Sequence, residues 1–172
     1  MHDPRTGNLL GAAALAVTDL MLEGVTELSG VGPSAASALV VLTVSPGLNG
    51  TELGRRVGLS QPASARMVDA LVSRQLAERR PGQGREIAIR LTRRGRRTAA
   101  DILAARSGRL AQALAVLDPA ERAILSGLLD KVLTGLYAEI GNADLLCRLC
   151  DRASCTTDAI CPVGQAERER NG

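Results

Sequence analysis

The sequence predicts a mainly α-helical chain with one small β-hairpin, on the basis of composition and of two apolar periodicities. Of its 172 residues 45% are hydrophobic but only 1% are aromatic, and Phe and Trp are absent. Leu, Val, Ile and Ala must therefore form the core, which favours helices packed on helices. Apolar residues recur at helical spacing along most of the chain, and strand-like alternation interrupts that spacing near residues 86–91.

Two helices are expected before residue 45. The first spans about residues 9–29 and ends at Gly30 and Gly32-Pro33; its apolar stripe contains Leu9, Leu10, Ala13, Val17, Leu20, Met21 and Leu28. The second spans about residues 34–44 and is nearly all apolar, so we expect it to be buried. We expect no stretch long and apolar enough to span a bilayer, and we expect a cytoplasmic protein.

The next two helices form a pair. Asn49, with Glu52 three residues later, is a capping box that starts one helix, which ends at Gly58. Ser60 caps the other, with Pro62 in its first turn. Its buried side is expected to contain Met67, Val68, Leu71 and Val72, with Ser64 facing inward too. Two short helices joined by a turn at a glycine are typical of a helix-turn-helix.

A β-hairpin and two long helices follow. Residues 81–84 form a turn, after which Ile87, Ile89 and Leu91 are expected to face inward, alternating with Glu86, Ala88 and Arg90. Thr92 caps a helix that reaches about residue 117. The run Asp118-Pro119-Ala120-Glu121 opens the last long helix, which reaches about residue 140 and closes at Gly141.

Basic residues are concentrated in one part of the chain. The formal net charge is only +3, yet between Arg55 and Arg97 there are twelve Arg and three acidic residues, so the remainder is net acidic. Arg suits bidentate contacts with phosphate and guanine, and such asymmetry predicts a polyanionic partner, although a solvated basic face is the alternative. Because stacking on single-stranded bases needs aromatic rings, duplex DNA is favoured over single strands.

The order of these parts, and several short phrases within it, resemble the MarR family of regulators over about residues 34–140. The shared phrases are Glu52-Leu53, Gly58-Leu59-Ser60-Gln61, Arg66-Met67-Val68-Asp69, Leu71, Leu76, Gly84-Arg85 and Leu91-Thr92 with Gly95. The resemblance implies a winged helix-turn-helix transcription factor, a repressor, whose terminal helices pair in a homodimer. Such a dimer reads an inverted repeat through two successive major grooves. Gln75 departs from the family's usual Gly, and Gln83 stands where an acidic residue is common.

This reading divides the chain into four parts. Residues 1–33 are an N-terminal dimerisation helix, 34–98 a winged helix-turn-helix DNA-binding domain, 99–141 C-terminal dimerisation helices, and 142–172 a cysteine-rich metal-binding tail. The resemblance would also allow a small-molecule effector between the dimer and DNA-binding parts, although the scarcity of aromatic residues gives no support for one.

The second helix of the pair is expected to enter the major groove by its N-terminal end. The DNA-contacting set is predicted to be Ser60, Gln61, Pro62, Ala65, Arg66, Arg79, Arg85 and Arg90. Gln61 suits adenine, Ala65 a thymine methyl, and Arg66 guanine or phosphate. Arg85 at the wing tip would enter a narrow minor groove, and Arg79 and Arg90 would contact phosphates. The alternatives are an Arg66–Asp69 ion pair and a solvated Arg85.

The tail carries four cysteines, Cys147, Cys150, Cys155 and Cys161, the last followed by Pro162. The Cys147-x2-Cys150 spacing is common to zinc and iron–sulfur sites, and a final Cys-Pro is typical of ferredoxin cluster motifs. Arg148 and Arg152 would offset thiolate charge. We expect an iron–sulfur cluster slightly ahead of Zn²⁺, with a disulfide or free thiols as the third alternative. A redox-active cluster would make the tail a sensor, whereas zinc would be structural.

An enzyme and a protein-interaction module are the two other classes of function to consider. The sequence shows no nucleophile–base set, P-loop or dinucleotide fingerprint, and His2 is its only His, so we expect no enzyme. A winged-helix protein-interaction module with a purely structural zinc site is the alternative to a DNA-binding regulator.

Overall fold

The computed structural model describes residues 4–82 and 84–172, and so His2 and Gln83 lie outside the described residues. Its elements confirm a mostly helical winged helix-turn-helix fold. In chain order they are α1 (Pro4–Ser29), α2 (Pro33–Val44), α3 (Gly50–Arg56), α4 (Gln61–Ser73), β1 (Ala77–Pro81), β2 (Ile87–Leu91), α5 (Arg93–Ala113), the 3₁₀ turn η1 (Leu114–Val116), α6 (Pro119–Ile140), α7 (Ala143–Leu146), α8 (Arg152–Cys155) and α9 (Pro162–Asn171).

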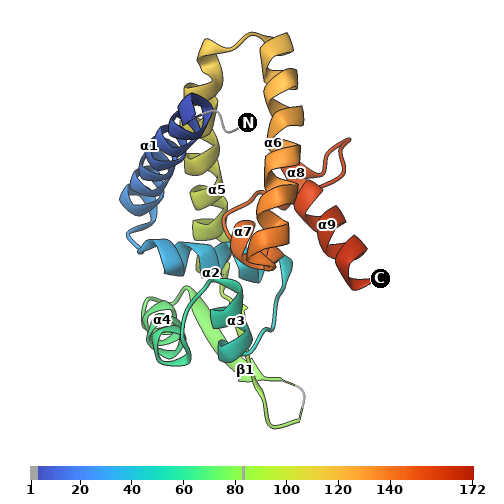
Figure 1. The fold of residues 1–172 in the computed structure, drawn as a ribbon. Helices are drawn as coiled ribbons and strands as arrows, with labels where there is room; N and C mark the ends of the chain where they lie inside the picture. Colours follow the sequence, from blue (N-terminus) through green and yellow to red (C-terminus); the bar gives the residue numbers. More distant parts are fainter. Residues whose placement is uncertain (1–3, 83) are drawn as a thin grey trace.

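Helix α2 lies at the centre of the fold (Figure 1). Helices α1 and α5 pack on each other and on α2, while α3, α4 and the β-hairpin lie on the opposite side of α2. Helix α6 stands apart from α1 and α5, and the segment that follows it returns toward α2 before ending in α9 (Figure 1). The helix-turn-helix thus lies at one end of the molecule and the long helices at the other.

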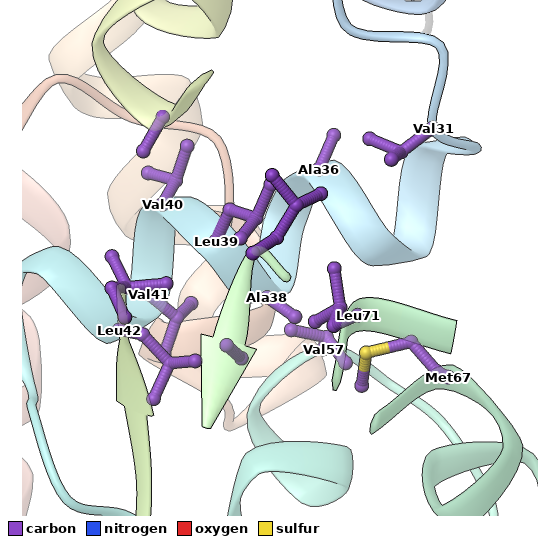
Figure 2. Close-up of a cluster of buried hydrophobic side chains, with 14 of the residues drawn as sticks. Val31, Ala36, Ala38, Leu39, Val40, Val41, Leu42, Val57, Met67 and Leu71 are labelled. Atoms are coloured by element: carbon purple, nitrogen blue, oxygen red, sulfur yellow. The ribbon is translucent and has the colours of Figure 1, made fainter. Parts of the chain in front are cut away.

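The core is built around α2, as its apolar sequence predicts. Leu39 and Leu42 are fully buried, and side chains of α3 and α4 pack in the same cluster. Figure 2 shows Val57, Met67 and Leu71 on one side of α2. The helix-turn-helix is therefore fixed to the rest of the chain by burial of apolar surface, with no need for aromatic residues.

Side-chain caps begin the helices mostly where the sequence places them. The Asp118 carboxylate accepts from the Glu121 backbone N–H at 2.9 Å, and the Glu121 carboxylate accepts from the Asp118 N–H at 2.9 Å. At Asn49 only half of the expected box forms, because the Glu52 carboxylate binds arginines instead. Ser60 precedes α4, but its hydroxyl makes no capping bond, so that part of the prediction is wrong.

The hairpin departs from the predicted alternation at one end. Ile89 and Leu91 are buried as expected, but Ile87 is 54% exposed and Ala88 is buried. Ile87 pairs with Pro81, at the end of the ladder farthest from α2 and α5. The core ends before that position, so no apolar surface is available to cover Ile87.

Two long helices leave large apolar side chains uncovered. On α1 these are Leu9, Leu10, Leu15 and Leu20, and on α6 they are Ile124, Leu128, Leu129, Val132, Leu136 and Ile140. By length and composition alone, residues 4–27 would pass as a membrane span, contrary to the expectation from sequence. The same composition suits a helix that another protein surface covers, and α1 packs on α5 along one side.

Candidate nucleic-acid interface and cysteine cluster

Helix α4 presents to solvent the face that is predicted to contact DNA bases, which we call the reading face. Gln61, Pro62, Ala65 and Arg66 are exposed, while Ser64, Met67, Val68 and Leu71 are buried on the opposite side. Ser60, just before the helix, is exposed as well, and its hydroxyl is not used as a cap. The N-terminal end of α4 is therefore free to meet a groove, with short and polar side chains around one guanidinium.

Close packing of α3 against α4 fixes this face. A Cβ atom at Gly54 would lie 2.6 Å from the Ser64 Cβ, so only glycine permits the approach. The Ser64 hydroxyl donates to the Gly50 carbonyl at 2.6 Å, which confirms that Ser64 faces inward. Gly58 takes a φ of +74° in the turn, where a left-handed conformation favours glycine.

The arginines near α4 divide into paired and unpaired groups. Asp69 does not pair with Arg66; it accepts a hydrogen bond from Arg79 of β1. Arg66 thus has no ion pair within residues 4–82 and 84–172. Arg79 would have to leave Asp69, or share it, to contact a phosphate.

Other arginines of the basic segment serve the fold. Arg74 donates to the Gly30 carbonyl, and Arg96 donates to the Leu91 carbonyl at 2.8 Å. On β1, Arg80 donates to Glu78 at 2.9 Å, and this hydrogen bond lowers the pKa of the exposed Glu78 carboxyl. Arg85 and Arg90 are exposed on the wing. Sequence reasoning could not separate these groups, because backbone carbonyl partners leave no mark in a sequence pattern.

A charge cluster on α3 was not predicted. Glu52 accepts from Arg55 at 2.8 Å and from Arg56 at 2.9 Å, and these hydrogen bonds lower its pKa to about 2. Asp144 of α7 lies 3.7 Å from Arg55 and 3.5 Å from Arg56, and it accepts from Arg152 at 3.0 Å. Through Asp144, the tail contacts the first helix of the helix-turn-helix.

Apolar contacts join the tail to both ends of the molecule. The Leu145 Cδ1 atom would lie 2.8 Å from a Cβ at Gly58, and Leu149 is part of the main core. At the other side, Val163 of α9 is buried with Tyr137 of α6. The tail therefore bridges α6 and the turn between α3 and α4, although its sequence predicted none of the helices α7, α8 and α9.

The four cysteines line one cavity of about 270 Å³ between α7, α8 and α9. All are free thiols, and Cys147, Cys150 and Cys161 are half-buried. The Cys150 thiol donates toward the Cys147 sulfur, which lowers the pKa of Cys147 and raises that of Cys150. Burial, with Cys150 nearby, raises the pKa of Cys155 to about 11. Within the described part of the chain, no three His, Cys, Asp or Glu side chains form a group that could hold a metal ion.

A larger cavity of about 590 Å³ lies beside this one, lined by α1, α2, the α3–α4 turn, α6 and the tail. Arg106 of α5 lines it together with the cysteines. The buried Nε of Arg106 has no hydrogen-bond partner among the described residues. Burying a guanidinium N–H is costly unless an acceptor pairs with it.

Comparison with known proteins agrees with this arrangement. Residues 29–86 match the model of the MarR family. The chain is similar to the YusO protein of Bacillus subtilis (25% identity over 74% of this chain and 92% of that one, TM-score 0.65). It is similar to RV1404 of Mycobacterium tuberculosis (27%, 83% and 97%, TM-score 0.64) and to the transcriptional repressor CouR bound to a 23-mer DNA duplex (28%, 73% and 90%, TM-score 0.60). No curated protein sequence matches.

The fold and the reading face define the class of protein: a winged-helix DNA-binding regulator. Residues 29–86 resemble the MarR family, and the solved structures of similar proteins share the same winged-helix fold.

Proposed function

We propose that this chain represses transcription as a homodimer that binds an inverted repeat in duplex DNA. The observation that carries the proposal is the exposed face of α4, where Arg66 has no ion-pair partner and Gln61, Pro62 and Ala65 surround it. A short helix with such a face at its N-terminal end fits a major groove, and its early residues reach base edges. The structural neighbour CouR is described as a transcriptional repressor, which supports repression over activation for this chain.

The dimer rests on the uncovered apolar side chains of α1 and α6. Monomeric proteins rarely expose apolar surface of this extent, and a second copy of the chain would cover it. Two-fold symmetry would then present two α4 helices to two half-sites about one helical turn apart. A cytoplasmic location follows from this role.

The cysteine tail supplies a route by which a chemical signal would alter DNA affinity. The ion pairs of Asp144 with Arg55 and Arg56, and the contact of Leu145 with Gly58, connect the tail to α3 and the turn before α4. Val163 and Tyr137 connect it to the helix expected to form the dimer. A change at the cysteines would therefore alter the spacing of the two α4 helices, and the regulator would sense the metal or redox state of the tail.

The experiment is a gel shift against fragments of the source genome, followed by measurement of affinity for the retained fragment. We expect Arg66→Ala to weaken specific binding by about 1–3 kcal/mol, because it removes a base or buried phosphate contact. Arg90→Ala should weaken binding to all DNA sequences evenly and reduce the dependence of the affinity on salt concentration. Arg122→Ala, near the start of α6, serves as the control, because that end of α6 lies far from α4 (Figure 1). Equal affinity for the wild type and Arg66→Ala would contradict the reading face.

Failure to retain any duplex would support the alternative, a protein-interaction module. Repression itself is tested by transcription in vitro from a promoter that overlaps the retained site. We expect transcripts to fall as protein is added, and a rise would reverse the proposed direction of control.

A further inference from the structure

The tail gathers four thiols around one space, although they come from three separate parts of the tail. Cys147 follows α7, Cys150 lies in the next turn, Cys155 ends α8 and Cys161 precedes α9. Backbone bonds hold these positions: the Cys150 N–H donates to the Cys147 carbonyl at 2.9 Å, and the Cys155 N–H donates to the Asp151 carbonyl at 2.9 Å. All four cysteines are among the residues that line a cavity of about 270 Å³.

Positive charge surrounds this cavity. Arg152 and Arg168 line it with the four cysteines, and Arg106 lines the adjoining larger cavity. Without a ligand, four neutral thiols would gain little from these guanidinium groups. Four thiolates on a metal centre would be stabilised by them, and the unpartnered Arg106 Nε would gain an acceptor.

The spacing of the cysteines in the sequence favours a cluster over a single ion. A zinc ion with Zn–S bonds of about 2.3 Å draws its four sulfurs to within about 3.8 Å of one another. No three described His, Cys, Asp or Glu side chains are already grouped around a metal position, but all four cysteines line the same cavity. The Cys147-x2-Cys150 spacing and the final Cys161-Pro162 are typical of ferredoxin cluster motifs. A polynuclear centre, with one thiolate on each iron, spans a wider cavity than one ion does.

We propose that Cys147, Cys150, Cys155 and Cys161 ligate one iron–sulfur cluster per chain, with the guanidinium of Arg106 beside it. On binding, each of the four thiols releases its proton to solvent and its sulfur bonds one iron. Two ferrous and two ferric ions with four inorganic sulfides supply the cluster, so no atom changes its oxidation state. This inference rests on the proposed function only for its role as a sensor; the site itself is independent of DNA binding.

The cluster would lie where the tail joins α6 to the helix-turn-helix. Its first ligand directly follows the helix that contacts Arg55, Arg56 and Gly58, and its last ligand directly precedes the helix that packs on α6. Assembly or loss of the cluster would thus tighten or release the link between α6 and the helix-turn-helix.

The test is metal and sulfide analysis of the full chain purified without oxygen, together with its visible absorption spectrum. We expect a brown protein with iron and acid-labile sulfide in equal amounts, and a colour that bleaches in air. Cys150→Ser and Cys161→Ser should lose both iron and sulfide, while Ser154→Ala, a change beside the ligands, should keep them. Circular dichroism of each variant separates loss of a ligand from loss of fold.

A colourless protein with one zinc per chain and no iron, even after anaerobic incubation with ferrous iron, ferric iron and sulfide, would overturn the cluster. Finding neither metal would overturn the site. Arg106→Gln should lose iron several-fold faster to a chelator than the wild type, and an unchanged rate would remove Arg106 from the site. Because none of these readouts uses DNA, their failure is distinct from failure of the proposed function, which the gel shift reports.

Discussion

At the scale of single residues, Gly95 shows how closely the parts of the winged helix approach. A Cβ at Gly95 would overlap the backbone carbonyl of Leu76, and backbone cannot move aside as a flexible side chain can. Thr92 strengthens the same junction, since its hydroxyl donates to the Gln75 carbonyl at 2.7 Å and accepts from the Gly95 N–H at 3.0 Å. The start of α5 is thereby fixed to the end of α4.

We expect Gly95→Ala to lower the free energy of unfolding by about 1–3 kcal/mol, the usual cost of overpacking. Gly108, on the same helix, has no atom within 4 Å of its Cβ position. Gly108→Ala should therefore be stabilising by up to about 1 kcal/mol through helix propensity. Denaturant unfolding of both variants measures the difference, and equal stabilities would show that the junction is looser than described.

Gln75 adopts the left-handed conformation that its place in the family pattern predicts, with a φ of +59°. A non-glycine residue pays about 1 kcal/mol for this conformation. Gln75→Gly should therefore raise the free energy of unfolding by about that amount, measured by thermal or denaturant unfolding. A loss of stability instead would mean that the Gln75 side chain contributes contacts that outweigh the strain.

The lowered pKa of Glu52 predicts a pH dependence. Because its pKa falls from 4.5 to about 2 on folding, the Glu52 carboxylate stabilises the folded chain above pH 4.5, and this contribution is lost as the pH falls toward 2. Glu52→Gln should reduce stability at pH 7 by about 1 kcal/mol or less, since its partners are partly exposed. The difference from wild type should shrink between pH 4.5 and 2, and a constant difference would contradict the assignment.

At the scale of elements, helix starts and stops were predicted best. Asn49, Thr92 and Asp118 cap α3, α5 and α6, and their side chains accept the expected backbone N–H bonds. Such caps involve residues within three positions of each other, so a sequence pattern contains all that is needed. Burial of α4 was predicted for the same reason, since helical spacing alone defines its apolar side.

The hairpin and the tail were predicted less well because their surroundings decide them. The strand-like alternation of the sequence does not indicate where the core ends, so Ile87 was predicted to be buried and Ala88 to be exposed, the reverse of what is found. Helices α7 and α8 have four residues each, too few for a periodic pattern. The polar helix α9 packs through Val163 against α6, a contact between distant parts of the chain. The contacts of Asp144 with Arg55 and Arg56 are equally distant in sequence.

The wing gives a prediction at this scale. Arg85 is exposed beside Gly84, whose φ of +62° turns the tip of the hairpin. If the tip enters a narrow minor groove, Arg85→Ala should weaken binding several-fold on sites with A·T flanks and little on sites with G·C flanks. Affinity for the two kinds of duplex measures this. An equal loss on both would reduce Arg85 to a phosphate contact, and no loss would leave it as a solvated loop residue.

At the scale of the whole molecule, the uncovered sides of α1 and α6 predict a dimer. Ile124 and Leu128 are exposed in the single chain, so charging them should disturb association and leave the fold of the chain intact. We expect Ile124→Glu with Leu128→Glu to halve the mass measured by light scattering. Ile160→Glu, at an equally exposed apolar position in the tail, is the control. A wild type that is monomeric at micromolar concentration would contradict the dimer.

The winged-helix fold and the exposed α4 face follow from local patterns in the sequence, whereas the way the tail joins α3 to α6 required the structure. The account as a whole depends on two copies of α4 meeting one DNA site. The most direct measurement is the stoichiometry and footprint of the full chain on the genomic fragment that it retains, by sedimentation and nuclease protection. The account predicts two chains per duplex and two protected half-sites about one helical turn apart. One chain per duplex, or a single protected half-site, would contradict it.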